Sequence, residues 1–441
     1  MLDKIIQALG KQDGADDWLV KHIRKTSTQH YVIGPHPESA RQVASEHVVV
    51  TVMNDHAAAK GSAGKVRGEA EVTLLPSDQN LQEKLGQVVF MASLADNPVY
   101  DLPGPAELPA VDIADPEMQQ APREVAERTV QQLLKTLQKE QDVRLSSAEV
   151  FVEERRIAVQ NSRGLGAEQT ETNVLLDYVL LASGAGDEME SHIAVERRRA
   201  ADLDVVAVVQ RQAQYARDAL VAVPPRTGTF PVVVSDDALA ELLVSEFDSP
   251  LIFRSSAQVK YQQMTPWEVG KSIFPQPPSG DAFILYSNAV LPFGNRSTRF
   301  DADGLPGQRC PIVDNGVLQR FWARHRYAQY LQVPATGSFA NMEIAAGSHP
   351  FVSLLQGEGP LYHIVAFSAM SPDPITGDFV GEIRLGYEIQ GGKAHPIKGG
   401  SISGNLFAAL SAAQLSRETV FWGDYLGPRG MRFPSITVAG A

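Results

Sequence analysis

The sequence has a single cysteine and no long apolar run. Cys310 is the only cysteine among 441 residues, so no disulfide can form within the chain. No apolar stretch approaches the roughly 20 residues that a helix needs to cross a bilayer. The opening segment, MLDKIIQALGKQDGADD, mixes acidic and basic side chains and lacks the apolar core of a signal peptide. We therefore expect a soluble protein of the reducing cytoplasm that does not contact membranes.

Positive charge is also scarce. The chain has 39 Lys and Arg residues against 52 Asp and Glu residues, a net charge of −13. Nucleic-acid binding depends on basic side chains that neutralise phosphates, so this balance argues against a DNA or RNA partner. The basic run at 197–199 has acidic neighbours and indicates a solvated face.

Clustered metal ligands are missing as well. Ten histidines are present, but no two of them are spaced as HxH, HxxH or HxxxH. Zinc sites normally take three or four clustered nitrogen or sulfur ligands. His363 lies in the apolar run LYHIVAF, which is typical of a buried, hydrogen-bonded histidine. The sequence therefore predicts no metal site within this chain.

Helical and strand patterns are mixed in the first half of the chain. Apolar residues recur at three- and four-residue steps and predict helices near 2–9, 126–137 and 206–220. Alternating apolar and polar residues predict strands at 46–55 and 67–76, and antiparallel strands within 148–183 that turn at Gly164 and Gly166. The proline-rich, acidic segment 102–122 predicts an extended surface connection.

Two domains are expected, because 441 residues exceed the size of one ordinary core. Pro224 and Pro225 cannot continue the preceding helix, and we place the boundary there. We predict an α+β fold, with an N-terminal mixed domain containing an antiparallel sheet (1–224) and a β-rich, barrel-like C-terminal domain (225–441). The clearest C-terminal element is 378–397, an alternating hairpin that turns at Gly391 and Gly392.

Five segments, most of them in the C-terminal half, recur in order in one known family. They are VQNSRG (159–164), GTFPVVVSDDALAELL (228–243), STRFDADGLPGQRCPIVDNGVLQRFWARHRYA (297–328), GYEIQGGKAHPIKGGSISGNL (386–406) and FPSITVAG (433–440). With these segments the chain resembles the TldD/PmbA family, which includes gyrase-modulator proteins and the paired peptidase subunits TldD and TldE.

The resemblance fails at the metal motif of the TldD type. TldD-type chains have HExxxH in the helix that follows the 228–235 strand, where two histidines bind zinc and the glutamate activates water. In this sequence the three positions are Val244, Ser245 and Ser249. A one-residue shift aligns Glu246 with the glutamate but supplies no imidazole. The family's further cysteine ligand near the C-terminus has no counterpart after Cys310. The chain is therefore similar to the TldE (PmbA) type, with vestigial motif positions.

The resemblance implies a non-metal-binding subunit of a cytosolic, heterodimeric TldD/TldE-type metallopeptidase that acts on small or unfolded peptides. Zinc is then expected in a TldD-like partner subunit. No catalytic or metal-binding residue is expected in this chain. An extended peptide substrate would lie along strand edges, where main-chain hydrogen bonds do not read side chains. The alternative is a stand-alone homodimeric binding or regulatory protein, gyrase-modulator-like and without peptidase activity.

Other motifs point to chemistry less strongly. Cys310 with His325 or His349 as base would form a nucleophile pair, but a lone cysteine is more often a small buried apolar residue. The segment TPWEVGKS (265–272) ends like a phosphate loop, yet Thr265 replaces the first glycine.

Two polar residues of the shared segments are candidate substrate contacts. Asp303 lies in RFDADG, where Asx-type turn bonds compete with any role in binding. Asn405 lies in GGSISGN, which turns in the same way whether or not the protein is catalytic. For both residues a substrate-binding role and a turn-stabilising role stay open.

Overall fold

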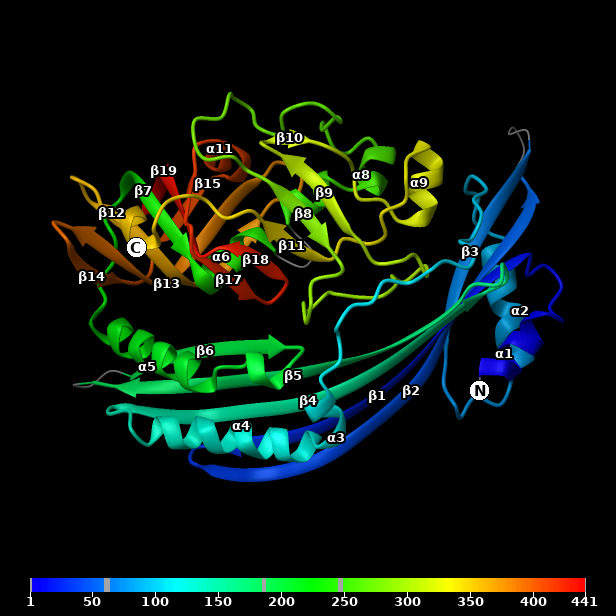
Figure 1. Ribbon diagram of the computed structural model, residues 1–441, viewed down its shortest axis with the longest axis horizontal. Coiled ribbons are helices and arrows are strands. Elements are labelled where there is room, and N and C mark those ends of the chain that lie inside the picture. The colour runs from blue at the N-terminus through cyan, green and yellow to red at the C-terminus, as the bar shows by residue number, and fades with distance from the viewer. Residues whose placement is uncertain (1, 59–63, 185–187, 245–248, 441) are drawn as a thin grey trace.

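The computed structural model describes residues 2–58, 64–184, 188–244 and 249–440. It contains an N-terminal part built on one large sheet and a C-terminal part built on two (Figure 1). The N-terminal elements are α1 (Leu2–Leu9), β1 (Asp17–Ile33), β2 (His36–Ala57), β3 (Lys65–Leu74), α2 (Leu81–Ala92), α3 (Pro116–Gln120), α4 (Pro122–Leu137), β4 (Val143–Asn161), β5 (Gly166–Ser183), β6 (Glu188–Arg197), a short 3-10 helix (Ala200–Asp202) and α5 (Val205–Val221).

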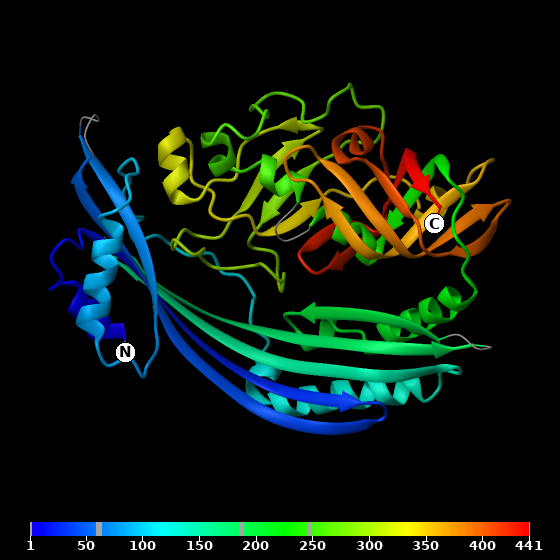
Figure 2. The same cartoon turned by 180° about the vertical axis from the view of Figure 1, so that it is seen from behind.

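The N-terminal sheet has the strand order β3-β2-β1-β4-β5-β6, and every neighbouring pair is antiparallel. Its strands are long: β2 has 22 residues, which corresponds to about 70 Å at the usual rise per residue. The sheet curves beneath the C-terminal part (Figures 1 and 2). One margin of the sheet is formed by the residues of β2 that precede the part of β2 paired with β3. The other margin is formed by β6.

Alternation along β4 and β5 buries one face of this sheet. Residues such as Val150, Val152 and Leu176 pack against α4 and α5, where Leu133 and Val209 are fully buried. α4 begins with Pro122 at its first turn, a position that needs no N–H donor. α1 and α2 pack on the other end of the sheet in a separate core.

The C-terminal elements follow after residues 222–227. They are β7 (Gly228–Ser235), α6 (Asp236–Leu243), α7 (Pro250–Arg254), α8 (Ala257–Tyr261), β8 (Leu285–Asn288), β9 (Arg309–Asp314), β10 (Val317–Leu318), α9 (His325–Leu331), β11 (Asn341–Ile344), α10 (Phe351–Leu354), β12 (Leu361–Pro372), β13 (Asp378–Gln390), β14 (Lys393–Ile397), β15 (Ser401–Asn405), α11 (Leu406–Ser411), β16 (Gln414–Leu415), β17 (Thr419–Trp422), β18 (Tyr425–Pro428) and β19 (Gly430–Ala439).

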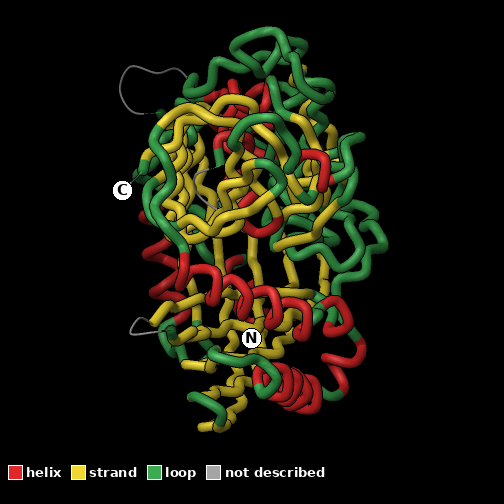
Figure 3. Tube along the Cα trace, turned by 90° about the vertical axis from the view of Figure 1, so that its left-hand side faces the viewer, coloured by secondary structure: helices red, strands yellow, loops and turns green. Residues whose placement is uncertain are grey.

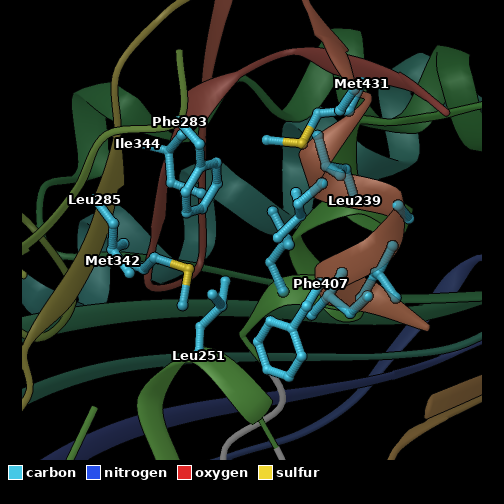
Figure 4. Close-up of a cluster of buried hydrophobic side chains, with 14 of the residues drawn as sticks. Leu239, Leu251, Phe283, Leu285, Met342, Ile344, Phe407 and Met431 are labelled. Atoms are coloured by element: carbon cyan, nitrogen blue, oxygen red, sulfur yellow. The ribbon is translucent and has the colours of Figure 1, made fainter. Parts of the chain in front are cut away.

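Five of these strands close into a barrel. The order β12-β7-β19-β15-β13 returns to β12 because β12 also pairs with β13, and β14 extends from β13. The second sheet has the order β10-β9-β8-β11-β18-β17. One core joins the two sheets, and in Figure 4 Leu239 and Met431 lie opposite Phe283, Leu285 and Met342. Figure 3 shows the C-terminal strands stacked above the N-terminal sheet.

The structure confirms the predicted α+β class with an antiparallel sheet and a barrel-like C-terminal part. The predicted helices correspond to α1, α4 and α5, and the hairpin turn has positive φ at Gly391 and Gly392. β1 and α2 were not predicted, and the short α3 interrupts the segment expected to be extended. The domain boundary at residue 224 stays a prediction. None of the helices within the described ranges is long and apolar enough to cross a bilayer.

Candidate functional site

A cavity of about 520 Å³ lies between the N-terminal sheet and the C-terminal part. Its lining residues come from β6, α5, α6, β12, β13 and the turn between β17 and β18. Trp422 at this turn contacts the cores of both parts. Two guanidinium groups lie over its ring: Arg211 Cζ is 4.9 Å and Arg197 Cζ is 5.3 Å from the ring centre. The cavity is therefore a junction that neither part forms alone.

The outer margin of β6 faces this cavity. Five consecutive residues, 190–194, line it, although successive side chains of a strand point to opposite faces. Only the edge of a strand can present both sets of residues to one space. In the described part of the chain no strand pairs with this margin. Side chains already donate to two of its carbonyls: Arg384 Nη1 to Glu190 O at 3.4 Å, and both Asn295 Nδ2 at 3.4 Å and Arg197 Nη1 at 2.7 Å to Glu196 O.

Helix α6 forms the opposite wall. The buried apolar strand β7 leads directly into it, and Asp236 and Asp237 in its first turn suit the positive end of the helix dipole. Leu239, Leu242 and Leu243 are buried in the C-terminal core. Asp237 and Glu241, one helical turn apart, line the cavity instead.

These two carboxyl groups have raised pKa values. Burial raises the pKa of Asp237 to about 6, with Arg211 opposing the rise and Asp236 adding to it. Burial and the neighbouring Asp237 raise the pKa of Glu241 to about 7. Burial also raises the pKa of Glu196. Because Asp424 and Glu190 line the same space, the cavity is acidic and can retain protons near neutral pH.

Unpaired polar atoms gather behind α6. Arg211 and Asp237 approach only to 3.9 Å. Within the described residues, Arg211 Nε and Nη2, Asp237 Oδ1 and Tyr178 Oη are buried without hydrogen-bond partners. Such groups are uncommon in folded interiors and favour a site with polar ligands or ordered water.

The predicted motif positions lie at the end of α6. Val244 lines the cavity and has no donor atom for a metal. Ser249 is buried and caps α7: its Oγ donates to Leu243 O at 2.6 Å and accepts from Ile252 N at 3.4 Å. Ser245 lies outside the described residues. No group of three His, Cys, Asp or Glu residues in the described ranges is arranged to hold a metal ion. The described residues do not fit a zinc site.

Asp303 and Asn405 lie elsewhere and make structural bonds. Asp303 pairs with Arg324, 3.1 Å from Nε to Oδ2. Asn405 Oδ1 accepts from Ala408 N at 3.2 Å and so caps α11, while its Nδ2 donates to Thr376 O at 3.0 Å. Neither residue lines the cavity at α6. The contacts of Asn405 favour the turn-stabilising role. The Asx-type turn bonds of RFDADG are accepted by Asp301 Oδ1, from Asp303 N at 2.9 Å and Leu305 N at 3.0 Å, so for Asp303 both roles stay open.

The competing motifs also have structural explanations. Cys310 is 2% exposed in the core of β9, and burial raises the pKa of its thiol. In the TPWEVGKS segment, Gly270 N donates to Leu318 O, so this amide is not free to bind a phosphate. His363 is half-buried, and its Nε2 lies 2.8 Å from Ser235 Oγ, so it is hydrogen-bonded as predicted but not fully buried.

Sequence inspection missed Asp237, Glu241 and Trp422. The two acids were visible as a pair four residues apart on a helix that follows a buried strand. On most helices such a pair lies on a solvated face, so its position in the cavity depends on β6 and the β17–β18 turn.

Parts of this chain are similar in sequence to known metallopeptidases. Residues 227–441 match the model of the PmbA/TldA metallopeptidase C-terminal domain. The zinc metalloprotease TldD homologue of Saccharolobus solfataricus is 25% identical over 31% of this chain and 34% of its own length. Metalloprotease PmbA of Escherichia coli O157:H7 is 25% identical over 56% of this chain and 54% of its own length. These matches thus span about half of each relative or less.

Similarity to a solved structure extends over the whole chain. The crystal structure of TldE from Thermococcus kodakarensis superposes with a TM-score of 0.83 at 19% identity, covering 100% of both chains. At this identity the similarity establishes the fold alone.

Proposed function

Because this chain belongs to the TldD/PmbA family, we propose that it is a TldE-like subunit, without a metal of its own, of a heterodimeric TldD/TldE-type metallopeptidase. In this proposal zinc belongs to the TldD-like partner, and the complex cleaves small or unfolded peptides in the cytoplasm. The observation that supports it most is the end of α6. Val244 offers no ligand atom there, and the Ser249 hydroxyl is committed to a helix cap.

The contribution of this chain would be to hold the peptide. The free margin of β6 offers main-chain donors and acceptors to an added strand, which binds without reading side chains. Arg384 holds the Glu190 carbonyl by a 3.4 Å bond only, so an arriving peptide could displace it, whereas the Glu196 carbonyl also accepts a 2.7 Å bond from Arg197 Nη1. The protonated forms of Asp237 and Glu241 would donate hydrogen bonds to peptide carbonyls on the opposite wall.

The first test compares the chain purified alone with the chain co-expressed with a TldD-type subunit. We expect no stoichiometric zinc and no chelator-sensitive peptide cleavage in the chain alone, and both in the complex. Metal content is measured by mass spectrometry and cleavage with an unfolded peptide. Chelator-sensitive cleavage by the homogeneous single chain would refute the proposal. A stable homodimer that ignores every TldD-type subunit would favour the stand-alone regulatory alternative.

A second test addresses the cavity. Ala194 lies on β6 and lines the cavity, whereas Ala106 is exposed in the connecting segment and does not. Ala194→Trp should block the cavity and lower cleavage by the complex at least tenfold, with zinc content and complex mass unchanged. Ala106→Trp should leave cleavage unchanged. Equal activity of both variants would show that the peptide does not use this margin.

A further inference from the structure

A second cavity, of about 310 Å³, lies beside the cavity at α6. Its floor is the face of the N-terminal sheet that points away from α4 and α5, and its roof is formed by C-terminal residues between 289 and 340. Asn295 lines both cavities. A third hollow, of about 320 Å³, shares Glu196 with the first cavity and Arg155 with the second. The two cavities are therefore parts of one continuous space between the sheet and the C-terminal part.

The two cavities carry opposite charge. The cavity at α6 is lined by five carboxyl side chains and one arginine: Glu190, Glu196, Asp237, Glu241 and Asp424 against Arg384. The second cavity is lined by four cations and two carboxyl groups: Lys21, Arg155, Arg198 and Arg296 against Glu171 and Asp301. Because the cavities adjoin, an anionic group is repelled from the first and attracted into the second.

The surplus positive charge lies at Arg155 and Lys21. Arg198 is 8% exposed and binds Glu171 at 3.0 Å, and Arg155 reaches the other oxygen of Glu171 at 3.3 Å. One carboxylate thus serves two guanidinium groups. Both oxygens of Asp301 accept bonds from main-chain N–H groups. Among the residues that the structure describes, Lys21 forms no ion pair.

We propose that the second cavity binds the C-terminal carboxylate of a peptide whose chain continues along β6 into the cavity at α6. The inference rests on the proposed function and specifies how its peptide is held. A guanidinium group and an ammonium group bind a carboxylate through strong, charge-assisted hydrogen bonds. Beside these cations the cavity is lined by Ile157, Phe300 and Phe339, which suit an apolar last side chain. The substrates are then peptides with a free carboxyl end and an apolar last residue.

The arrangement also gives the direction of the peptide. β6 runs from Glu190 at the acidic cavity toward Arg198 at the second cavity. A peptide with its carboxyl end beside Arg198 therefore runs parallel to β6. Ala194 and Arg198 are four residues apart, which corresponds to about 13 Å of extended chain. A peptide of about five residues or more reaches both cavities, whereas a shorter one fills only the second.

The terminal group of the peptide provides the first test, by calorimetric titration of the full chain alone. The probe is an unstructured peptide of about ten residues ending in leucine, long enough for both cavities, with a free or an amidated carboxyl end. The free form should bind at least about tenfold more tightly, because hydrogen bonds between charged groups are the stronger ones. Arg155→Gln should abolish most of this preference.

Arg156→Gln is the matched control for Arg155→Gln. Arg156 lies on the opposite face of β4, donates to Glu154 at 2.7 Å and does not line the second cavity. This variant should keep the full preference for the free carboxylate. No binding, equal binding of the two peptides by the wild type, or an equal effect of the two variants would overturn the proposal. If Arg155→Gln lowered the melting temperature without changing the preference, Arg155 would serve only its cross-strand bond to Glu171, and the proposal would also fail.

Ala194→Trp tests whether one peptide occupies both cavities. Blocking the cavity at α6 should weaken binding of the long peptide about tenfold and leave binding of a tripeptide ending in leucine unchanged. Equal effects on both peptides would refute the proposal. These measurements need neither a partner subunit nor cleavage. A carboxylate preference without peptidase activity in the complex would refute the proposed function but not the binding site, and cleavage without a carboxylate preference would refute the binding site alone.

Discussion

Arg67 on β3 should be among the most important polar residues for stability. Its side chain is 2% exposed, and it donates to Asp55 Oδ1 at 2.6 Å, to Asp17 Oδ2 at 2.9 Å and to Tyr100 O at 2.5 Å. These bonds join β1, β2 and β3 to the segment that leads toward the C-terminal part. Arg67→Ala removes all of them and leaves Asp17, itself 4% exposed, without one of its cations.

The expected magnitude follows from burial. Breaking a buried ion pair by removing one partner costs about 3–5 kcal/mol, because the remaining charge is left uncompensated. Exposed pairs contribute only about 0–1 kcal/mol. Arg128, which is 46% exposed and pairs with Glu117, is therefore the control. Arg67→Lys should recover only part of the loss, since one ammonium cannot span Asp17, Asp55 and the Tyr100 carbonyl.

Urea denaturation followed by circular dichroism measures these differences. A loss below about 1 kcal/mol for Arg67→Ala, no larger than for Arg128→Ala, would refute the assignment of a buried network. The pH dependence gives a second check. Burial alone would raise the pKa of Asp17, but hydrogen bonds from Arg163, Ser162 and Arg67 lower it overall. A depressed folded-state pKa stabilises the protein above the ordinary value of 3.8 and is lost as pH falls below it. This acid-sensitive contribution should shrink in Arg67→Ala.

Two further predictions concern the cavity and the N-terminal cap of α11. The pKa of Asp237 is about 6 when folded against 3.8 ordinarily, so the folded state binds the extra proton and stability falls as pH rises through this window. Asp237→Asn should remove this part of the decline, worth about 1.3 kcal/mol between pH 5 and pH 7, in melting temperatures compared at these two pH values; an unchanged decline would contradict the burial of this group. Asn405→Ala removes the cap of α11 and should cost about 1 kcal/mol of stability without changing peptide cleavage by the complex. Reduced cleavage at unchanged stability would instead assign Asn405 to substrate binding.

The predictable elements were those with a complete local pattern. α4 and α5 each present one apolar face over four turns or more, and their proline and aspartate residues mark the starts. β1 escaped prediction because Lys21, Arg24 and Lys25 interrupt its alternation, although its neighbours β2 and β4 hold it in the centre of the sheet. α2 has a shorter apolar face and ends in exposed Phe90 and Met91, which blur its periodicity.

Residue identity alone establishes the family segments and the chemistry of each position: Val244 and Ser249 cannot act as imidazoles in any fold. It also determined the helices whose apolar faces are read from neighbouring residues. Packing between distant segments brings Asp237 on α6, Ala194 on β6 and Trp422 on β17 to one cavity, and within the described residues it leaves one side of residues 36–47 of β2 unpaired. These features depend on contacts between residues that are far apart in the sequence. Periodicity records which face of an element is buried, whereas the partner that buries it, or its absence, depends on packing between segments distant along the chain.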